Sequence, residues 1–306
     1  ARSVDGELVP FDYGLASGDS RGVLALCSYD PDGGGLLPRQ LVAAGDIYYS
    51  QVVRWDDDHW SSLSPPGLAS CEVMASVDFD GPGPAGDTLI ASGSSNARAK
   101  TVSAIQRTDG ATWTPMGGVS SGILDLVGFD PDGAGPATPE IFACGANPQT
   151  GLLHWSGGAW DRAATPVGAV SFCIHDPDGL GPQTPQLLCV GTDQIVYRLA
   201  DDHWLPVTPP LVGIRRVHSL DIDTSDAEPA MIVAIGIDQV YRYVDPTWVL
   251  QQPTAHGRFP IGTSYDSKVF DPDGPGGVGA SLFVVGPFYA VGNQPSVGAY
   301  RFDGRM

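Results

Sequence analysis

One short pattern recurs along the whole chain: two aspartates separated by one residue, placed directly after an apolar run. Its fullest form lies in residues 129–145, FDPDGAGPATPEIFACG. Asp-Pro-Asp-Gly is typical of a tight turn, because Asp caps its own backbone, Pro fixes φ and Gly tolerates a positive φ. Each copy therefore predicts a strand, a turn and a second strand. The aspartate pairs are Asp30/Asp32, Asp78/Asp80, Asp130/Asp132, Asp176/Asp178, Asp221/Asp223 and Asp271/Asp273.

A glycine ends the apolar run after each turn, and these glycines lie 45 to 52 residues apart. A period of this size, with several short strands per copy, is typical of propeller blades or of a β-solenoid. The runs beside the turn, such as ILDLVGFD and EIFACG, are almost continuously apolar, which suits strands buried on both faces. The glycines are Gly45, Gly93, Gly145, Gly191, Gly236 and Gly286.

Two further strands are predicted in each copy, so that the four strands are called A, B, C and D in chain order. Strand C carries an aromatic residue near its end, as in VVRWD at residues 52–56 and LLHWS at residues 152–156. In most copies strand D begins at a tryptophan a few residues later. The short polar links between them, such as DDDH and SGGA, predict a C–D hairpin. Helical periodicity is essentially absent.

The two ends of the chain fit one repeat between them. The sequence stops just after strand C of the sixth copy, and residues 4–10, VDGELVP, look like the missing turn and strand D. We therefore expect the N-terminal segment to complete the last blade and to close a ring, which removes an exposed sheet edge. The predicted fold is all-β: a six-bladed β-propeller of four-stranded antiparallel blades, with residues 1–306 as a single domain.

The repeat resembles that of the WD-repeat propellers, with Val52-Val53-Arg54-Trp55-Asp56 as its best match to their Trp-Asp-ending strand. The Gly-His pair of that family is missing before every strand A, so its internal hydrogen-bond network is not carried over. The FDPDGxGP turn and the tryptophan of strand D look closer to bacterial repeat proteins of unknown function. Residues 191–198, GTDQIVYR, are similar to bacterial propeller lectins.

Charge and composition exclude some classes of function. The net charge is −19 with two lysines, and such a surface repels phosphate backbones, which argues against general nucleic-acid binding. No apolar run approaches the roughly 18–20 residues that span a bilayer. The five cysteines form no CxxC pair and no zinc set. We expect a monomer without a cofactor, in a secreted or cell-envelope setting.

The aspartate turns admit a second interpretation, which is a calcium site at Asp130 and Asp132. D-x-D-G opens many calcium loops, with oxygen ligands two residues apart. DPDGAGPATP, however, offers only two carboxylates, whereas a loop of the EF-hand type needs about six oxygens. Turn chemistry is therefore the preferred interpretation and calcium is the alternative.

The recurring tryptophans of strands C and D also have two interpretations. They could stack sugars in pockets between blades, or they could pack the outer strands against the next blade. Packing is preferred, because it explains why the position recurs.

The strand order separates two kinds of loop. The A–B and C–D loops share one end of each blade, here called the aspartate end, and the B–C and D–A loops share the other, here called the loop end. The aspartate end must be strongly acidic, whereas several of the few cations fall at the loop end. Variable polar and aromatic loops on a regular scaffold are where binding normally resides. The predicted ligand-binding residues are Tyr49, Arg98, Lys100, Arg215, Arg216, Arg258 and Tyr289.

One disulfide is hypothesised. Strands A and B of the fourth copy form a hairpin that would bring Cys173 roughly opposite Cys189. A cross-strand disulfide needs Cα atoms within about 7 Å of each other.

Two classes of function remain open at the level of sequence. The first is a non-enzymatic binding or scaffold propeller that engages a protein or a glycan through its loop end. The alternative is a glycosidase- or lyase-like enzyme with its site at the mouth of the central channel, which needs converging carboxylates or a His/Arg cluster. Most acidic residues fall in the recurring turns, so binding is favoured. A purely structural module of a larger exported protein is a third possibility.

Overall fold

The computed structural model describes residues 2–4, 7–9 and most of 22–302. The chain forms two compact units, with residues 1–129 and 138–162 in unit 1 and residues 130–137 and 163–306 in unit 2. Outside the described residues lie 1, 5–6, 10–21, 34, 36, 38, 48–49, 57–58, 81–83, 95–102, 120–121, 133–137, 146–150, 164–167, 179–182, 222–229, 237–238, 252–265, 271–279, 286–289, 292–293, 296–298 and 303–306.

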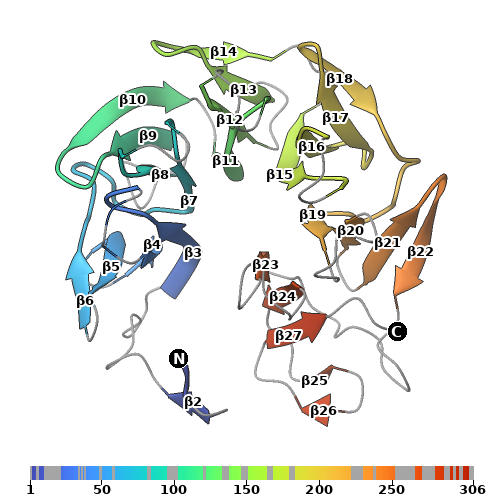
Figure 1. The fold of residues 1–306 in the computed structure, drawn as a ribbon, viewed down its shortest axis with the longest axis horizontal. Helices are drawn as coiled ribbons and strands as arrows, with labels where there is room; N and C mark the ends of the chain where they lie inside the picture. Colours follow the sequence, from blue (N-terminus) through green and yellow to red (C-terminus); the bar gives the residue numbers. More distant parts are fainter. Residues whose placement is uncertain are drawn as a thin grey trace. The chain divides into compact units, whose positions relative to one another are not determined.

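Unit 1 holds three four-stranded antiparallel sheets in which the strands pair in chain order (Figure 1). The first consists of β3 (Gly22–Tyr29), β4 (Gln40–Asp46), β5 (Val52–Asp56) and β6 (His59–Ser62). The second consists of β7 (Val73–Val77), β8 (Thr88–Ser94), β9 (Ser103–Thr108) and β10 (Trp113–Val119). The third consists of β11 (Asp125–Phe129), β12 (Glu140–Cys144), β13 (Leu152–Trp155) and β14 (Trp160–Arg162).

Unit 2 holds two further four-stranded sheets and one of three strands. The fourth sheet consists of β15 (Ala169–His175), β16 (Gln186–Gly191), β17 (Val196–Ala200) and β18 (His203–Pro206). The fifth consists of β19 (Arg216–Leu220), β20 (Met231–Ile235), β21 (Val240–Val244) and β22 (Thr247–Gln251). The last consists of β23 (Asp266–Phe270), β24 (Ser281–Val285) and β27 (Ala299–Phe302). The short pair β25 (Ala290–Val291) and β26 (Gln294–Pro295) lies between β24 and β27 in the chain.

The all-β prediction and the A–B–C–D strand order are confirmed for these five complete sheets. In the last sheet the described residues supply three strands. The N-terminal segment, predicted to add the fourth strand, pairs with itself as β1 (Arg2–Val4) and β2 (Glu7–Val9). Six blades in a closed ring therefore stay a prediction. No helix long and apolar enough to cross a bilayer occurs in the part of the chain that the structure describes.

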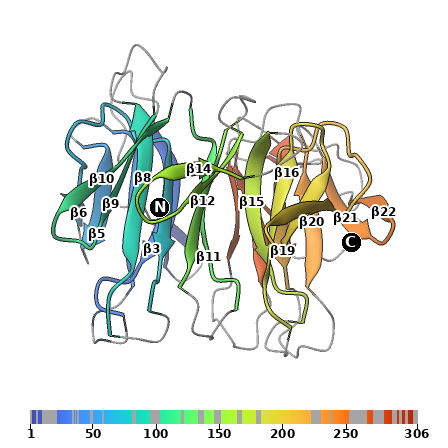
Figure 2. The same cartoon turned by 90° about the horizontal axis from the view of Figure 1, so that it is seen from above.

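Within each unit, neighbouring sheets pack face to face and their first strands contact each other, as β3 and β7 do in unit 1 (Figure 1) and β15 and β19 do in unit 2 (Figure 2). Each such seam has its own apolar cluster. Leu126 of β11 packs with Ile90 of β8 in unit 1, and Leu282 of β24 packs with Val233 of β20 in unit 2. Strands buried on both faces explain why their sequences are continuously apolar. The core thus consists of separate apolar interfaces between neighbouring sheets. A sheet with a neighbour on each side is stabilised by packing against both.

The glycine that ends strand B has a physical reason at Gly93. A Cβ there would lie 1.8 Å from the carbonyl oxygen of Ser70, in the chain that leads into β7. Only glycine allows the backbones to approach this closely. In four other copies the N–H of this glycine donates to a carbonyl just before strand C: Gly45 to Gln51, Gly145 to Gly151, Gly191 to Ile195 and Gly236 to Gln239, at 2.8–3.0 Å.

The predicted disulfide is wrong. The register of β15 and β16 pairs Cys173 with Leu188 and Phe172 with Cys189. Because successive side chains of a strand point to opposite faces, this offset of one residue puts the two sulfur atoms on opposite faces of the sheet. Cys173 and Cys189 form no disulfide.

Candidate functional site

The aspartate turns are closed by their own carboxylates. In four turns the first aspartate accepts a hydrogen bond through Oδ1 from the backbone N–H of the second, at 3.1–3.3 Å. In three turns the second aspartate accepts through Oδ2 from the N–H five residues later, at 3.0–3.1 Å. This is the backbone capping expected of aspartate in turns. The turns are those at Asp30, Asp78, Asp130 and Asp176.

The turn at Asp130 and Asp132 follows the same geometry, with 3.2 Å between Asp132 N and Asp130 Oδ1. In the described part of the chain, no three His, Cys, Asp or Glu side chains gather in a way that could hold a metal ion. Calcium at Asp130 and Asp132 stays a prediction, which a thermal melt with calcium against chelator would test.

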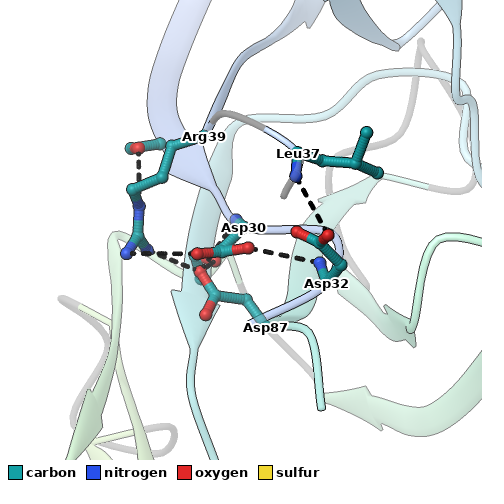
Figure 3. A network of polar contacts seen from close by, with 7 residues as sticks. Asp30, Asp32, Leu37, Arg39 and Asp87 are labelled. Carbon is teal, nitrogen blue, oxygen red and sulfur yellow. Dashed lines mark hydrogen bonds and ion pairs between the residues drawn. The ribbon is translucent and has the colours of Figure 1, made fainter. Parts of the chain in front are cut away.

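A buried carboxylate joins the first two sheets at the aspartate end. Asp87, whose side chain is 3% exposed, accepts hydrogen bonds from Arg39 Nη2 at 2.7 Å and Ser76 Oγ at 2.7 Å. The N–H of Asp30 donates to the same oxygen at 3.1 Å, so the turn of one sheet is tied to the next (Figure 3). A buried charge is tolerated when it is paired and hydrogen-bonded in this way. The network stabilises the fold, and it engages the carboxylate of Asp87 and the guanidinium of Arg39 within the protein.

Two of the tryptophans of strand D form hydrogen bonds to the neighbouring sheet. Trp113 Nε1 donates to the carbonyl oxygen of Leu63 at 2.7 Å, and Trp248 Nε1 donates to that of Pro209 at 3.1 Å. In both cases the acceptor lies just beyond strand D of the preceding sheet. The packing interpretation is therefore confirmed for these two residues, whose indole N–H groups are already used.

Only part of the predicted binding set lies among the described residues. Tyr49, Arg98, Lys100, Arg258 and Tyr289 fall outside them. Arg215 and Arg216 are described, at the start of β19 and at the loop end of the fifth sheet. Arg215 is the last residue of the segment 207–215, here called the β18–β19 loop, and Arg216 follows it as the first residue of β19. This loop is the best-defined candidate for a binding element.

Hydrogen bonds to the fourth sheet fix one side of the β18–β19 loop. Val207 N donates to the carbonyl of Val196 at 2.8 Å. Leu211 N donates to the carbonyl of Gln194 at 2.9 Å, and Gly213 N donates to Gln194 Oε1 at 2.8 Å. Gln194 lies in the turn between β16 and β17, with φ of 70°. Because Gln194 accepts hydrogen bonds from the loop through its backbone carbonyl and its side chain, the turn and the loop stabilise each other.

Contacts with the fifth sheet fix the other side of the loop. Tyr243 Oη donates to the carbonyl of Val207 at 3.0 Å, in addition to the indole bond from Trp248 to Pro209. Arg215 N donates to the carbonyl of Ile235 at 2.8 Å, and the side chain of Ile214 is buried. A loop anchored on both sides presents its tip in one conformation, which lowers the entropy cost of binding.

The tip of this loop is apolar and open to solvent. Val212 is 86% exposed, far more than any other large apolar side chain that the structure describes. Pro209 and Pro210 are exposed as well. Gly213, with φ of 86°, turns the chain back toward β19. Arg215 is exposed, and no ion pair of its side chain is found within the described ranges.

The neighbouring B–C turn adds a carboxylate that is already engaged. Asp193 accepts from Tyr197 Oη at 2.6 Å and from the N–H of Ile195 at 3.3 Å. Burial, followed by the hydrogen bond to Asp193, raises the pKa of Tyr197 to about 12, so the phenol remains a donor at neutral pH. Asp193 therefore stabilises the turn, and Arg215 is left to face solvent.

The sequence pointed to the two arginines but missed the residues beside them. The run PPLVG at residues 209–213 was the available signal, since four consecutive apolar residues in a loop are unusual. The role of Gln194 could not be read from the sequence, because its contact with Gly213 spans 19 residues.

No protein-family model matches the chain, and no curated protein matches it. Solved structures do. BBS1N, crystallised in complex with ARL6DN, is 14% identical, with 93% of this chain and 80% of that chain covered and a TM-score of 0.57. Sqt1 of Saccharomyces cerevisiae is 11% identical, with 93% and 72% covered and a TM-score of 0.54. The BP39L lectin of Burkholderia pseudomallei is 16% identical, with 90% and 84% covered, but its TM-score of 0.49 is too low to bear on function.

BBS1N and Sqt1 are β-propellers. At such low identity the likeness shows the fold alone. Together with the series of four-stranded antiparallel sheets, it shows that the chain has a β-propeller fold. The expected resemblance to propellers is thereby confirmed at the level of fold.

Proposed function

We propose that this protein is a non-enzymatic binding propeller that engages a protein or a glycan through its loop end. The observation that carries the proposal is the β18–β19 loop, which is anchored on two sheets and presents an exposed apolar tip beside Arg215. Preformed loops on a rigid scaffold are common binding elements. BBS1N, a propeller of similar fold, is seen bound to ARL6DN, which supports a role in binding.

The enzyme alternative gains no support from the described residues. A glycosidase or lyase needs carboxylates or a His/Arg cluster that converge on one site. In four A–B turns the aspartates cap the backbone at the aspartate end, and Asp193 at the loop end is held by Tyr197 and Ile195. We further propose a monomer in a secreted or cell-envelope setting, and light scattering tests the first part.

We also propose the architecture that positions this end: six sheets in a closed ring, with the N-terminal segment as the fourth strand of the last sheet. Leu26 of β3 is 45% exposed, whereas its equivalents Met74 and Leu126, each three residues before the end of strand A, are 5% exposed. In a closed ring the last sheet would cover Leu26. The outer edge of β27, which pairs with no further strand among the described residues, would receive the N-terminal strand, as sheet edges in soluble proteins are normally covered or paired.

Blocking each end of the molecule in turn tests the binding proposal. Cysteine is placed at Thr192 of the loop end or at Asp202 of the aspartate end, in a background with Cys27→Ser and Cys173→Ser, and is then coupled to a polyethylene glycol maleimide. Both positions are exposed. Ligands are first selected with the unmodified protein from a glycan array and a random peptide library.

Coupling at Thr192 is expected to abolish binding of the selected ligands, and coupling at Asp202 is expected to leave it unchanged. Binding that survives at Thr192 and is lost at Asp202 would place the site at the aspartate end and overturn the proposal.

A further inference from the structure

We infer that the ligand is a protein, and that the β18–β19 loop inserts Val212 into an apolar pocket of that partner beside an acidic residue that pairs with Arg215. This inference rests on the proposed function and names the partner class for the same site. Three features of the loop support it: an apolar tip, a fixed conformation and the exposed positive charge of Arg215, which forms no ion pair with the described residues.

The apolar tip is larger than one chance surface residue. Single exposed apolar side chains are normal and need no explanation. Here Pro209, Pro210 and Val212 are exposed within one run of apolar residues. Such a run is a liability for solubility unless it serves a function. Contact with an apolar surface of a partner protein would be such a function.

The fixed conformation favours a protein pocket over a sugar. Leu211 and Gly213 donate to Gln194, and Ile214 N donates to the carbonyl of Leu211 at 3.2 Å, so the residues on both sides of Val212 are held. A held aliphatic side chain loses little entropy when it enters a pocket. Sugars are usually bound through aromatic faces and hydrogen-bonding groups, and the nearby indole N–H of Trp248 is already bonded to Pro209.

The charge beside the tip indicates an acidic partner group. The chain as a whole carries −19, yet Arg215 and Arg216 are adjacent at this point. The carboxylate of Asp193 is engaged by Tyr197 and Ile195. A carboxylate on the partner would therefore complement the exposed Arg215. At physiological ionic strength the Debye length is about 8 Å, so the acidic turns at the far end of the sheets are screened from it.

The test uses the intact chain and a phage-displayed random peptide library, with peptides containing an apolar residue near Asp or Glu expected among those enriched. Affinities of synthesised peptides are measured by fluorescence anisotropy. Val212→Asp is expected to weaken binding about tenfold or more, since it removes an apolar contact. Arg215→Gln is expected to weaken it about threefold, as befits one exposed ion pair. Val244→Asp is the matched control, because Val244 is also exposed, at 47%, but lies at the aspartate end.

Val212→Thr, which keeps the shape of the side chain, guards against misfolding and is expected to give an intermediate loss with an unchanged melting temperature. Peptides that bind equally well to the Val212→Asp variant overturn the inference. A library that yields no peptide, while a glycan binds and is blocked by coupling at Thr192, also overturns it and leaves the proposed function standing. Binding that is insensitive to coupling at Thr192 defeats both.

Discussion

Strand A of the first sheet, β3, is more exposed to solvent than strand A of the other sheets compared with it. Leu26 of β3 is 45% exposed, and Leu24 beside it is 36% exposed. The residues equivalent to Leu26 in the second, third, fifth and last sheets are exposed by 5% or less; they are Met74, Leu126, Val217 and Ser267. The sequence of β3 is as apolar as theirs, so it is suited to burial that its own unit does not supply.

The covered strands show which residues meet across a seam. His175, the last residue of β15, bonds through Nδ1 to Ser219 Oγ of β19 at 2.9 Å. His218 bonds through Nε2 to Ser267 Oγ of β23 at 2.6 Å. Each strand A therefore uses one face toward the following sheet and the other toward the preceding one. The face of β3 that carries Leu24 and Leu26 is the one that a preceding sheet would cover.

The largest effect is expected when a charge replaces a covered leucine. Leu126→Asp should lower the free energy of unfolding by about 4 kcal/mol, because it buries an unpaired carboxylate. If the last sheet covers β3, Leu26→Asp should cost at least about 2 kcal/mol. Urea denaturation measures both, with Val244→Asp as the exposed control. A Leu26→Asp loss below about 0.5 kcal/mol, like that of the control, would show that the face is open to water.

A smaller effect is expected where the seam holds a charge that is already satisfied. Asp87→Asn should cost about 3 kcal/mol, because the amide keeps one acceptor oxygen but removes the negative charge that Arg39, Ser76 and the N–H of Asp30 share. Arg39→Gln should cost no more than about 1 kcal/mol, since the arginine side chain is 57% exposed. Equal losses in the two variants, measured by urea denaturation, would mean that the ion pair and not the buried carboxylate carries the stability.

The smallest effect at neutral pH is expected at the seam of β19 and β23. Burial, then Lys268 and Arg216, lowers the pKa of His218 to about 3. In the unfolded chain this histidine has an ordinary pKa near 6.5, so between about pH 6.5 and pH 3 the unfolded state binds the extra proton. Stability from this group is thus complete above pH 6.5 and falls as the pH drops toward 3.

His218→Gln should therefore cost about 1 kcal/mol at pH 7, the value of one hydrogen bond to Ser267. The difference from the parent protein should shrink or reverse by pH 4. Urea midpoints at pH 7 and pH 4 measure the change. A difference that stays constant between the two pH values would contradict a depressed pKa.

Much of the fold could be predicted from the sequence, because the repeat sets strand number and order locally. Aspartate turns and closing glycines are short-range signals, and in the copies that the structure describes both lie where they were expected. The register between strands was predicted one residue wrong at Cys173 and Cys189. The long A–B turn of that hairpin does not fix the register, and a slip of one residue changes the face of every side chain.

The candidate site could be predicted only in part. Arg215 and Arg216 stand out because cations are rare in this chain. The exposure of Val212 and the hydrogen bond from Gly213 to Gln194 depend on contacts between two loops, which no local sequence pattern encodes. The same holds for Arg39 and Asp87, which are 48 residues apart.

The proposed architecture requires the sheets to form a closed ring, and one cross-link tests this directly. Lys268 occupies the position of His218 in its own strand, and Leu26 occupies that of Ser267, so in a ring these two should meet as His218 and Ser267 do. The variant Leu26→Cys with Lys268→Cys, in the Cys27→Ser and Cys173→Ser background, is oxidised mildly and its intact mass is measured. His218→Cys with Ser267→Cys is the positive control. A closed ring predicts disulfide formation in both variants, whereas a disulfide in the control alone would contradict it.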